Sequence, residues 1–516
     1  MKIKNILSLT LFFVATLFIQ SCSDKDSVSA SGLSVTGVTA DELSFDSPAN
    51  SKMIGITTDG DWTISVPDAD TAWLSVTPHS GYGWEYTDTT KSNTNAYVKV
   101  MVQKNAGATR TSLITVSTGN LTKEIKVTQK GVAMDPNDPF ESVYSLIENI
   151  KVGYNWGNTL DSNPSGDWWT SSIQGLSGRD LALKYETSWG QPVTEKVMID
   201  SLAARGFNII RIPVTWGPHL DANNKIDEAW MARVKEVVDY VISNNCYCII
   251  NVMHDTGTSG WLRADKDMYA DETVKYQAIW KQVAEEFKSY DQKLIFESFN
   301  EILNANSSWT GPADKSAYET INKLQQDFVN TVRATGGNNE YRNLAITTYA
   351  ATGNAGDGDP LAELVVPTDK HPNHIYLSIH SYDPYNFCNY NAGKNTDGSS
   401  FDYNKSVWDE ECTATIDKLF ERLNSTSDRL GIPYVLGEFG AIDASKNITE
   451  RIKYVDYVAG KLKANGTTGL WWMGLYDRKT QTWNNNYEYT DKDNVSQKLS
   501  VDESVLVQHL MNIFSK

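Results

Sequence analysis

The sequence is poor in positive charge and carries no nucleotide-binding motif. Its 46 basic residues are outnumbered by 64 acidic ones, which gives the 516-residue chain a formal net charge of −18. Because an acidic field repels polyanions, nucleic acid and anionic membrane surfaces are disfavoured as partners, whereas a neutral polymer would not be repelled. No glycine-rich dinucleotide or phosphate loop follows any expected strand, and we expect no cofactor.

Cysteine is also scarce, with five residues in the whole chain. Cys246 and Cys248 lie two residues apart in an expected strand, so their side chains share one face. Because no C-x-x-C pattern or histidine cluster accompanies them, they are predicted to be buried thiols, and no metal site is predicted. The sequence leaves open whether Cys388 and Cys412 pair in an oxidising compartment.

The apolar run from Ile6 to Ile19 follows two lysines, a pattern typical of a secretion signal. Serine and threonine interrupt the run, and it is shorter than the roughly 20 apolar residues that span a bilayer. It ends in IQSC, which resembles a bacterial lipobox. We therefore predict that residues 1–21 are a lipoprotein signal peptide and that Cys22 is lipidated; soluble secretion is the alternative.

Lipidation of Cys22 would make the mature protein an outer-membrane lipoprotein that faces the periplasm or the cell surface. Lipoproteins carry several acyl chains, which anchor a protein more firmly than one chain does. The lipid is then the only membrane contact that the sequence predicts. We expect the protein to be a monomer.

Residues 34–131 consist of short runs in which apolar and polar residues alternate. Examples are WTISVP, YVKVMVQ and KEIKVTQ, which are separated by Gly, Asp, Asn and Pro and show no helical period. This pattern predicts a small antiparallel, immunoglobulin-like β-sandwich. The markers Trp62, Trp73, Asn105, Arg110 and Gln129 resemble those of the BACON domain, a sandwich common in carbohydrate-degrading proteins of Bacteroidetes.

The function of this sandwich is not fixed by its sequence. Trp84 and Tyr86 offer flat faces on which a sugar could stack, but a spacer role is favoured over binding. Residues 132–139, VAMDPNDP, contain two prolines and are predicted to form a short, stiff linker.

From residue 140 to residue 516, strand and helix patterns alternate regularly. A helix is expected over 194–206, for example, with Thr194 as its cap and Gly206 as its stop. Near-continuous apolar strands that alternate with helices predict a parallel sheet covered on its outer face. Eight such units favour a (β/α)8 TIM barrel over an open doubly wound sheet. The expected strands are 153–158, 207–214, 246–253, 294–300, 343–349, 374–380, 433–439 and 470–475.

Polar and aromatic residues collect at the carboxyl ends of these strands, where barrels of this kind carry their function. They are Arg211, His254, Asn300, Glu301, His380, Tyr382, Glu438, Trp471 and Trp472. Along FESFNE, Glu297 and Glu301 are four residues apart and point to one side of the strand. Glu297 is predicted to be structural, buried and paired, and Glu301, at the rim, to be functional.

Glu438 supplies a second carboxylate at the end of another strand. Glycosidic cleavage requires two such acids, a neutral one that protonates the leaving oxygen and an ionised one that attacks the anomeric carbon. Unequal environments divide these roles between Glu301 and Glu438.

Seven motifs resemble glycoside hydrolase family 5 over nearly all of residues 140–516. They are GNTLD, ETSWG, GFNIIRIPVTW, INVMHD, FESFNE, HSYDPY and LGEFGA. GNTLD and ETSWG resemble the endoglucanase and xyloglucanase subfamily more than the mannanases. The resemblance implies that Glu301 is the acid/base and Glu438 the nucleophile of a retaining mechanism. Met253 departs from the pattern, because many relatives carry a second histidine there.

The resemblance also implies how the nucleophile is held. Arg211 and Tyr382 would keep Glu438 ionised, because donated hydrogen bonds and a positive charge favour the carboxylate. Retention predicts that the two catalytic carboxyls lie roughly 5 to 5.5 Å apart.

Further residues are implied to contact the substrate. His380 and His254 would line the side of the protonated Glu301, and Asn300 would bind the sugar 2-hydroxyl. Asn158 of GNTLD is assigned to substrate binding as well.

Tryptophans that follow the strands suit a long cleft in which sugar rings stack. Trp189 is assigned to substrate binding, and Trp216 and Trp261 are further candidates. Trp471 and Trp472 alternate faces, so that only one of them is expected to face the substrate, and both are kept as candidates.

These observations predict a retaining endo-β-1,4-glucanase that acts on a neutral plant cell-wall glucan, with xyloglucan as the first expectation. A mixed-linkage glucanase, a cellulase or a mannanase of the same family is the alternative within this class. The alternative from another class is a surface glycan-binding protein that kept the cleft but lost turnover.

Overall fold

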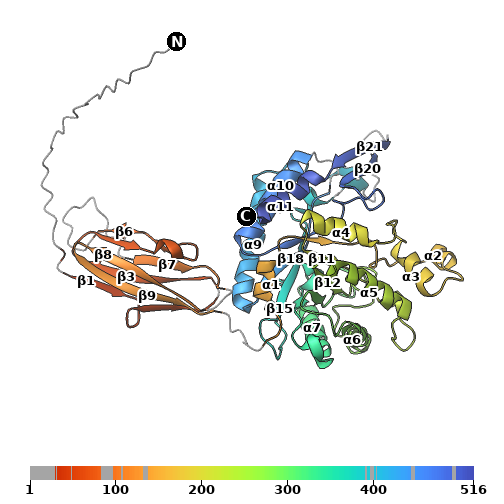
Figure 1. The fold of residues 1–516 in the computed structure, drawn as a ribbon, viewed down its shortest axis with the longest axis horizontal. Coiled ribbons are helices and arrows are strands. Elements are labelled where there is room, and N and C mark those ends of the chain that lie inside the picture. Colours follow the sequence, from red (N-terminus) through yellow and green to blue (C-terminus); the bar gives the residue numbers. More distant parts are fainter. Residues whose placement is uncertain are drawn as a thin grey trace, which may run out of the picture. The chain divides into compact units, whose positions relative to one another are not determined.

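The computed structural model describes residues 30, 32–47, 49–82, 97–105, 109–131, 138–389, 392–394, 400–402, 404–442, 448–490 and 496–515. The chain divides into two compact units, Met1–Lys104 with Arg110–Lys130, and Asn105–Thr109 with Gly131–Lys516 (Figure 1). The predicted signal peptide, Cys22, Trp84 and Tyr86 lie outside the described residues. No helix in the described part of the chain is long and apolar enough to cross a membrane.

The first unit is a β-sandwich of two sheets, as predicted. One sheet has the order β1 (Leu33–Thr36), β3 (Asn50–Thr58), β7 (Tyr97–Val102), β5 (Leu74–Thr77). The other has the order β2 (Glu42–Phe45), β9 (Leu121–Gln129), β8 (Arg110–Thr118), β4 (Trp62–Ser65), β6 (Ser80–Gly81). The 3-10 turn η1 (Asp68–Asp70) lies between β4 and β5.

The expectation of a fully antiparallel sandwich is wrong for one pair of strands, because β2 runs parallel to β9. The chain does not close a hairpin between β1 and β2. It turns through Ala40 and Asp41, which both have positive φ, and crosses from one sheet to the other. β2 therefore enters the second sheet beside β9 in the same direction.

The marker residues of the sandwich pack against one another. Arg110 donates from Nε and Nη2 to Gln129 Oε1 at 3.0 and 2.9 Å, and its guanidinium lies 4.4 Å from the centre of the Trp73 ring. Gln129 is fully buried and donates to the Gln103 carbonyl at 2.9 Å. Arg110, Gln129 and Trp73 therefore have structural roles in the sandwich, because they pack together and satisfy one another's buried polar groups.

The second unit contains a closed barrel of eight strands, and every neighbouring pair is parallel. All eight strands lie where the sequence predicts them. They are β10 (Gly153–Asn155), β11 (Ile209–Ile212), β12 (Tyr247–Asn251), β13 (Leu294–Glu297), β14 (Leu344–Ile346), β15 (Ile375–Ser381), β18 (Tyr434–Phe439) and β19 (Gly469–Trp472). The barrel class is therefore confirmed.

Helices surround the barrel (Figure 1). They are α1 (Val143–Asn149), α2 (Asp167–Ser172), α3 (Gly178–Glu186), α4 (Lys196–Arg205), α5 (Glu228–Ile242), α6 (Tyr269–Glu286), α7 (Ser316–Ala334), α8 (Tyr385–Cys388), α9 (Glu410–Leu430), α10 (Ile448–Ala464) and α11 (Ser504–Phe514). Short 3-10 turns are η3 (Gly217–His219), η4 (Gly337–Glu340) and η5 (Tyr349–Ala351). Two hairpins, β16 (Ala392–Lys394) with β17 (Ser400–Asp402) and β20 (Asn484–Thr490) with β21 (Ser496–Asp502), lie in the connections.

Of the two predicted end signals of helix α4, the structure confirms one. Gly206 ends the helix in the left-handed conformation at φ +109°, which glycine adopts without strain. Thr194 is not the cap, because Glu195 occupies that position and gives no side-chain hydrogen bond. The Thr194 hydroxyl instead accepts a hydrogen bond from Trp156 Nε1 at 2.9 Å and so holds the loop before α4 against Trp156.

The cysteines of the barrel unit all lie inside it. Cys246 and Cys248 are buried thiols, as predicted. Cys388 and Cys412 are buried as well and carry thiols, with no disulfide between them.

Candidate active site

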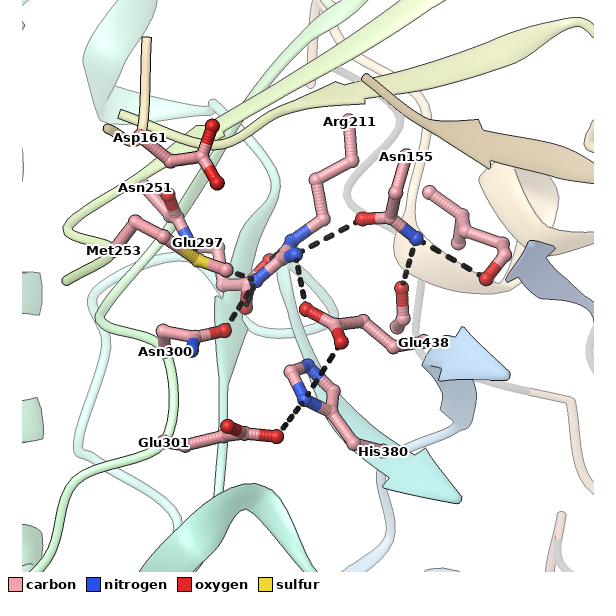
Figure 2. A network of polar contacts seen from close by, with 12 residues as sticks. Asn155, Asp161, Arg211, Asn251, Met253, Glu297, Asn300, Glu301, His380 and Glu438 are labelled. Carbon is pink, nitrogen blue, oxygen red and sulfur yellow. Dashed lines mark hydrogen bonds and ion pairs between the residues drawn. The ribbon is translucent and has the colours of Figure 1, made fainter. Parts of the chain in front are cut away.

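Arg211, in β11, lies at the centre of a buried polar network at the carboxyl ends of the strands (Figure 2). Its Nε and Nη2 donate to the two oxygens of Glu297 at 2.7 and 3.0 Å, and its Nη1 donates to Glu438 Oε1 at 2.8 Å. Glu297 is thus buried and paired, as predicted. Burial would lower the pKa of Arg211, but Glu297 and Glu438 raise it above its ordinary value, so the guanidinium stays charged.

Glu438, in β18, accepts hydrogen bonds on both carboxylate oxygens. Arg211 binds Oε1, and the Tyr382 hydroxyl donates to Oε2 at 2.8 Å. The expected contacts of Arg211 and Tyr382 are therefore present, and both lower the pKa of Glu438. Burial acts in the opposite direction and, with a further contribution from Glu301, raises the pKa of Glu438 above its ordinary value. The hydrogen bonds from Arg211 and Tyr382 thus offset only part of the effect of burial on the Glu438 carboxylate.

His380 bridges the two candidate acids. Its Nδ1 lies 2.9 Å from Glu301 Oε1 and 3.6 Å from Glu438 Oε2. One oxygen of each carboxylate and one ring nitrogen lie within 4.8 Å of one another. Burial lowers the pKa of His380, but Glu438 and Glu301 raise it above its ordinary value overall. One ring nitrogen of His380 thus lies close to both carboxyl groups.

His254 follows β12 and is held from another direction. Its Nε2 lies 3.5 Å from Asp161 Oδ2, and its ring centre is 5.1 Å from that of Trp189. Burial lowers its pKa, whereas Asp161 and, less strongly, Glu301 raise it above the ordinary value. His254 lines the same pocket as Glu301, as expected. The carboxylate that pairs with it is that of Asp161.

Asn158 and Asp161 both belong to the turn that follows β10. Asp161 is fully buried and accepts from the main-chain nitrogens of Asn158 and Thr159 at 3.0 and 2.7 Å. Asn158 has φ +61°, a left-handed conformation that asparagine tolerates better than most residues. The described contacts of Asn158 thus belong to the turn. The sequence reasoning gave Asp161 no role, although it closes the GNTLD motif.

Asn300 lies in the network beside the acid/base candidate. It is buried, and its Oδ1 accepts from Arg211 Nη2 at 2.9 Å. This bond fixes the amide and turns Nδ2 away from Arg211 (Figure 2). Asn300 therefore presents a donor, which suits the predicted contact with a sugar hydroxyl.

A pocket of about 470 Å³ opens over these residues. Its wall includes Met253, His254, Glu301, Tyr382, Glu438, Trp471 and Trp472. The Met253 sulfur lies 4.0 Å from Arg211 Nη2 and 3.6 Å from Asn251 Nδ2. A thioether sulfur is a weak acceptor, so Met253 gives only weak contacts to this network.

The structure separates the candidate tryptophans by exposure. Trp216 is 1% exposed and its Nε1 donates to the Asn251 carbonyl, so its assignment to sugar stacking is wrong. Its ring is enclosed in the barrel core. Trp261 is half-buried below Lys275, whose Nζ lies 4.0 Å from the ring centre. Trp471 is 2% exposed, which leaves Trp472 with the more accessible face of the pair.

Among the described residues, three tryptophans expose large faces. They are Trp168, Trp189 and Trp309, with 62%, 38% and 54% of their surface exposed. Trp168 and Trp189 lie on the connection after β10, and Trp309 lies on the connection after β13. Of these three, only Trp189 was predicted to bind substrate, because the position of a residue in the sequence indicates its loop but not the exposure of its side chain.

The second unit is a closed (β/α)8 barrel with two glutamates at the carboxyl ends of its strands, and one carboxylate oxygen of each lies within 4.8 Å of the other. This is the architecture of a two-carboxylate glycoside hydrolase. The family model for cellulases of glycosyl hydrolase family 5 matches residues 172–477. The chain belongs to glycoside hydrolase family 5. A second family model, that of the BACON domain, described as an N-terminal binding domain, matches residues 61–130.

Three relatives illustrate the similarity. Endoglucanase A of Clostridium longisporum is 35% identical over 359 residues, which is 66% of this chain and 63%, less than two thirds, of that protein. A xyloglucan-specific endo-beta-1,4-glucanase of Bacteroides ovatus is 29% identical over 488 residues, or 91% of both chains. The crystal structure of a mutant family 5 enzyme from Prevotella bryantii in complex with a xyloglucan tetradecasaccharide has a TM-score of 0.60 and 35% identity, and the match covers 73% of this chain and 99% of that one.

Proposed function

We propose that the protein is a retaining endo-β-1,4-glucanase of plant cell-wall glucans and that xyloglucan is its preferred substrate. The observation that carries the proposal is that one carboxylate oxygen of Glu301 lies within 4.8 Å of one carboxylate oxygen of Glu438. Retaining enzymes place the two carboxyls about 5 Å apart, whereas inverting enzymes leave about 6.5 Å or more for a water molecule. The separation therefore favours direct attack on the sugar.

In the first step, Glu438 attacks the anomeric carbon while Glu301 gives its proton to the leaving oxygen. Arg211 and Tyr382 hold the attacking carboxylate in place through one oxygen each. In the second step, Glu301 removes a proton from water, which then attacks the glycosyl-enzyme ester. Two inversions return the anomeric carbon to its starting configuration.

Similarity to named relatives supports the substrate. The Bacteroides ovatus enzyme is named for xyloglucan and is similar over 91% of both chains. The Prevotella bryantii structure was solved with a xyloglucan oligosaccharide. Relatives named only as endoglucanases support cellulose or mixed-linkage glucan as the second candidate. The intact set of Glu301, Glu438, Arg211 and Tyr382 argues against a protein that only binds glycans.

The stereochemistry of the product tests this proposal. We expect proton NMR of freshly hydrolysed xyloglucan oligosaccharide to show the β-anomer first, with the α-anomer appearing only by mutarotation. Reducing-sugar release from xyloglucan, mixed-linkage glucan, carboxymethylcellulose and mannan then ranks the substrates. An α-anomer as the first product would contradict the double displacement, and no release from any of the four glycans would contradict the hydrolase assignment.

Trp309 is proposed to stack on a glucose ring outside the pocket. Its loop is fixed, because the Tyr349 hydroxyl donates to the Ser308 carbonyl at 2.6 Å and accepts from Asn304 N at 3.1 Å. An exposed indole on a fixed loop loses little entropy when it binds a sugar.

We therefore expect Trp309→Ala to raise KM for the polymer about tenfold, which corresponds to roughly 1.4 kcal/mol of lost stacking. The same variant should leave the hydrolysis of an aryl β-cellobioside within about twofold, because the proposal assigns to Trp309 a glucose ring that this short substrate lacks. Trp309→Phe keeps a flat ring and is the matched control. Equal losses on the two substrates would rule out a role confined to the long chain.

We also propose that Cys22 is lipidated and anchors the mature protein in the outer membrane. Cys22→Ser is expected to abolish incorporation of a labelled fatty acid and to move the protein from the membrane fraction to the soluble fraction. Cys246→Ser, which alters a buried thiol, is the control. Labelling that survives in the Cys22 variant would contradict the proposal.

A further inference from the structure

Asn155 is the last residue of β10 and is fully buried beside the nucleophile candidate. Its Oδ1 accepts a hydrogen bond from Arg211 Nη1 at 2.9 Å, and this nitrogen is the one that donates to Glu438 Oε1 (Figure 2). Its Nδ2 donates to the Gly437 carbonyl at 2.9 Å and to the Leu470 carbonyl at 3.1 Å. One amide thus contacts both the partner of Glu438 and the residue before it.

The backbone at Gly437 is irregular and needs this support. On one side of β18, Leu436 pairs with Ile379 and Glu438 with His380, so Gly437 has no partner in the ladder. On the other side, the register between β18 and β19 also shifts between Leu436 and Phe439. Both shifts describe a β-bulge at the peptide that precedes Glu438. A bulge leaves ladder groups without their usual partners and turns the following side chain to a new direction.

Glycine keeps the bulge close to the neighbouring strand, because any side chain at position 437 would displace the Ser378 hydroxyl. A Cβ at position 437 would lie 2.2 Å from Ser378 Oγ, far inside van der Waals contact. The strand therefore approaches its neighbour closely just where Glu438 must be aimed. The Gly437 carbonyl, which points toward β10, is satisfied by Asn155 Nδ2.

We propose that Asn155 is a positioning residue that aims Glu438 at the anomeric carbon. It acts in two ways, by fixing Arg211 Nη1 against one carboxylate oxygen and by tying down the bulged peptide through Gly437. The side-chain amide suits this role because it accepts at one end and donates at the other without adding charge. This inference rests on the nucleophile role proposed for Glu438.

Two substitutions separate these contributions. Asn155→Ala removes the contacts to Arg211 and Gly437, together with the weaker bonds to the Leu470 and Trp471 carbonyls. Asn155→Asp keeps the shape and the acceptor for Arg211, but it removes the donor to Gly437 and adds a negative charge that competes with Glu438 for the guanidinium. Asn343→Ala is the matched control, because Asn343 is equally buried, bonds to His374 at 2.8 Å, and lies just before β14 at the opposite end of the barrel.

The substrate is 2,4-dinitrophenyl β-cellobioside, whose leaving group needs no proton from Glu301, so that its rate of glycosylation reports the attack by Glu438. We expect kcat/KM to fall about 10²-fold in both Asn155 variants, the loss that follows from a misplaced reacting group. In Asn155→Asp the acidic limb of the pH profile should also move to higher pH, because the added charge raises the pKa of Glu438. Asn343→Ala should change the melting temperature and leave kcat/KM per folded molecule and the pH limb unchanged.

The outcomes separate the two proposals. If the wild-type protein does not hydrolyse this substrate, the function proposed for the site fails. If the wild type is active and Asn155→Asp stays within threefold of it with an unshifted pH limb, the positioning role is overturned. If Asn155→Ala does not fold, Asn155→Asp, which keeps the shape of the side chain, decides the question alone.

Discussion

Glu438→Ala is expected to remove glucan hydrolysis almost completely, with kcat falling roughly 10⁵-fold, as it does when an enzyme loses its nucleophile. The fold should survive, because Arg211 keeps its two bonds to Glu297 and its bond to Asn155 when Glu438 is lost. Circular dichroism and the melting temperature check the fold, and reducing-sugar release from xyloglucan measures the activity.

A small anion distinguishes a lost nucleophile from a damaged pocket. Added azide or formate is expected to fill the space left in Glu438→Ala and to attack an activated β-aryl cellobioside directly, with departure of the aryl group as the phenolate. The product with azide and the β-substrate would then be the α-azide, formed by a single inversion. Activity of Glu438→Ala near that of the wild type would contradict the assignment of the nucleophile.

Glu301→Gln is expected to lower kcat on xyloglucan by roughly 10²- to 10⁴-fold, the usual contribution of a general acid. The loss should depend on the leaving group. Formation of the glycosyl-enzyme from 2,4-dinitrophenyl β-cellobioside needs no protonation and should stay near the wild-type rate, after which slow hydrolysis of the ester gives a burst of dinitrophenol.

Azide gives the complementary result at this position. In Glu301→Ala, azide should accelerate turnover by attacking the glycosyl-enzyme and yield the β-azide, because two inversions restore the configuration. Since His380 Nδ1 contacts Glu301 at 2.9 Å, the glutamine variant preserves a polar partner for the histidine. Equal losses for good and poor leaving groups would contradict the acid/base role of Glu301.

The barrel could be predicted from the sequence because its signals are local and repeated. Eight apolar runs that alternate with helical patterns predict a parallel sheet covered on its outer face, and all eight strands lie where they were expected. The sandwich was predicted on the same grounds. Its parallel pair β2 and β9 was missed, because that pair depends on a crossing between sheets and not on the alternation within either strand.

In the site, too, some features follow from local sequence pattern and others depend on tertiary packing. Strand period alone placed Glu301 at the rim and Glu297 below it, and Glu297 is indeed buried against Arg211. The exposure of Trp309 and the burial of Trp216 were not predictable, because both residues follow strands and only packing distinguishes them.

By itself, then, the sequence determined the elements, their order, and the strand ends at which polar groups gather, since these follow from periodicity over a few residues. The tertiary structure alone decided what those groups touch. Asn155, Arg211 and Glu438 are separated by 56 and 227 residues along the chain, and closure of the barrel brings them within hydrogen-bond distance. The bulge at Gly437 likewise arises from register between neighbouring strands, which no single strand encodes.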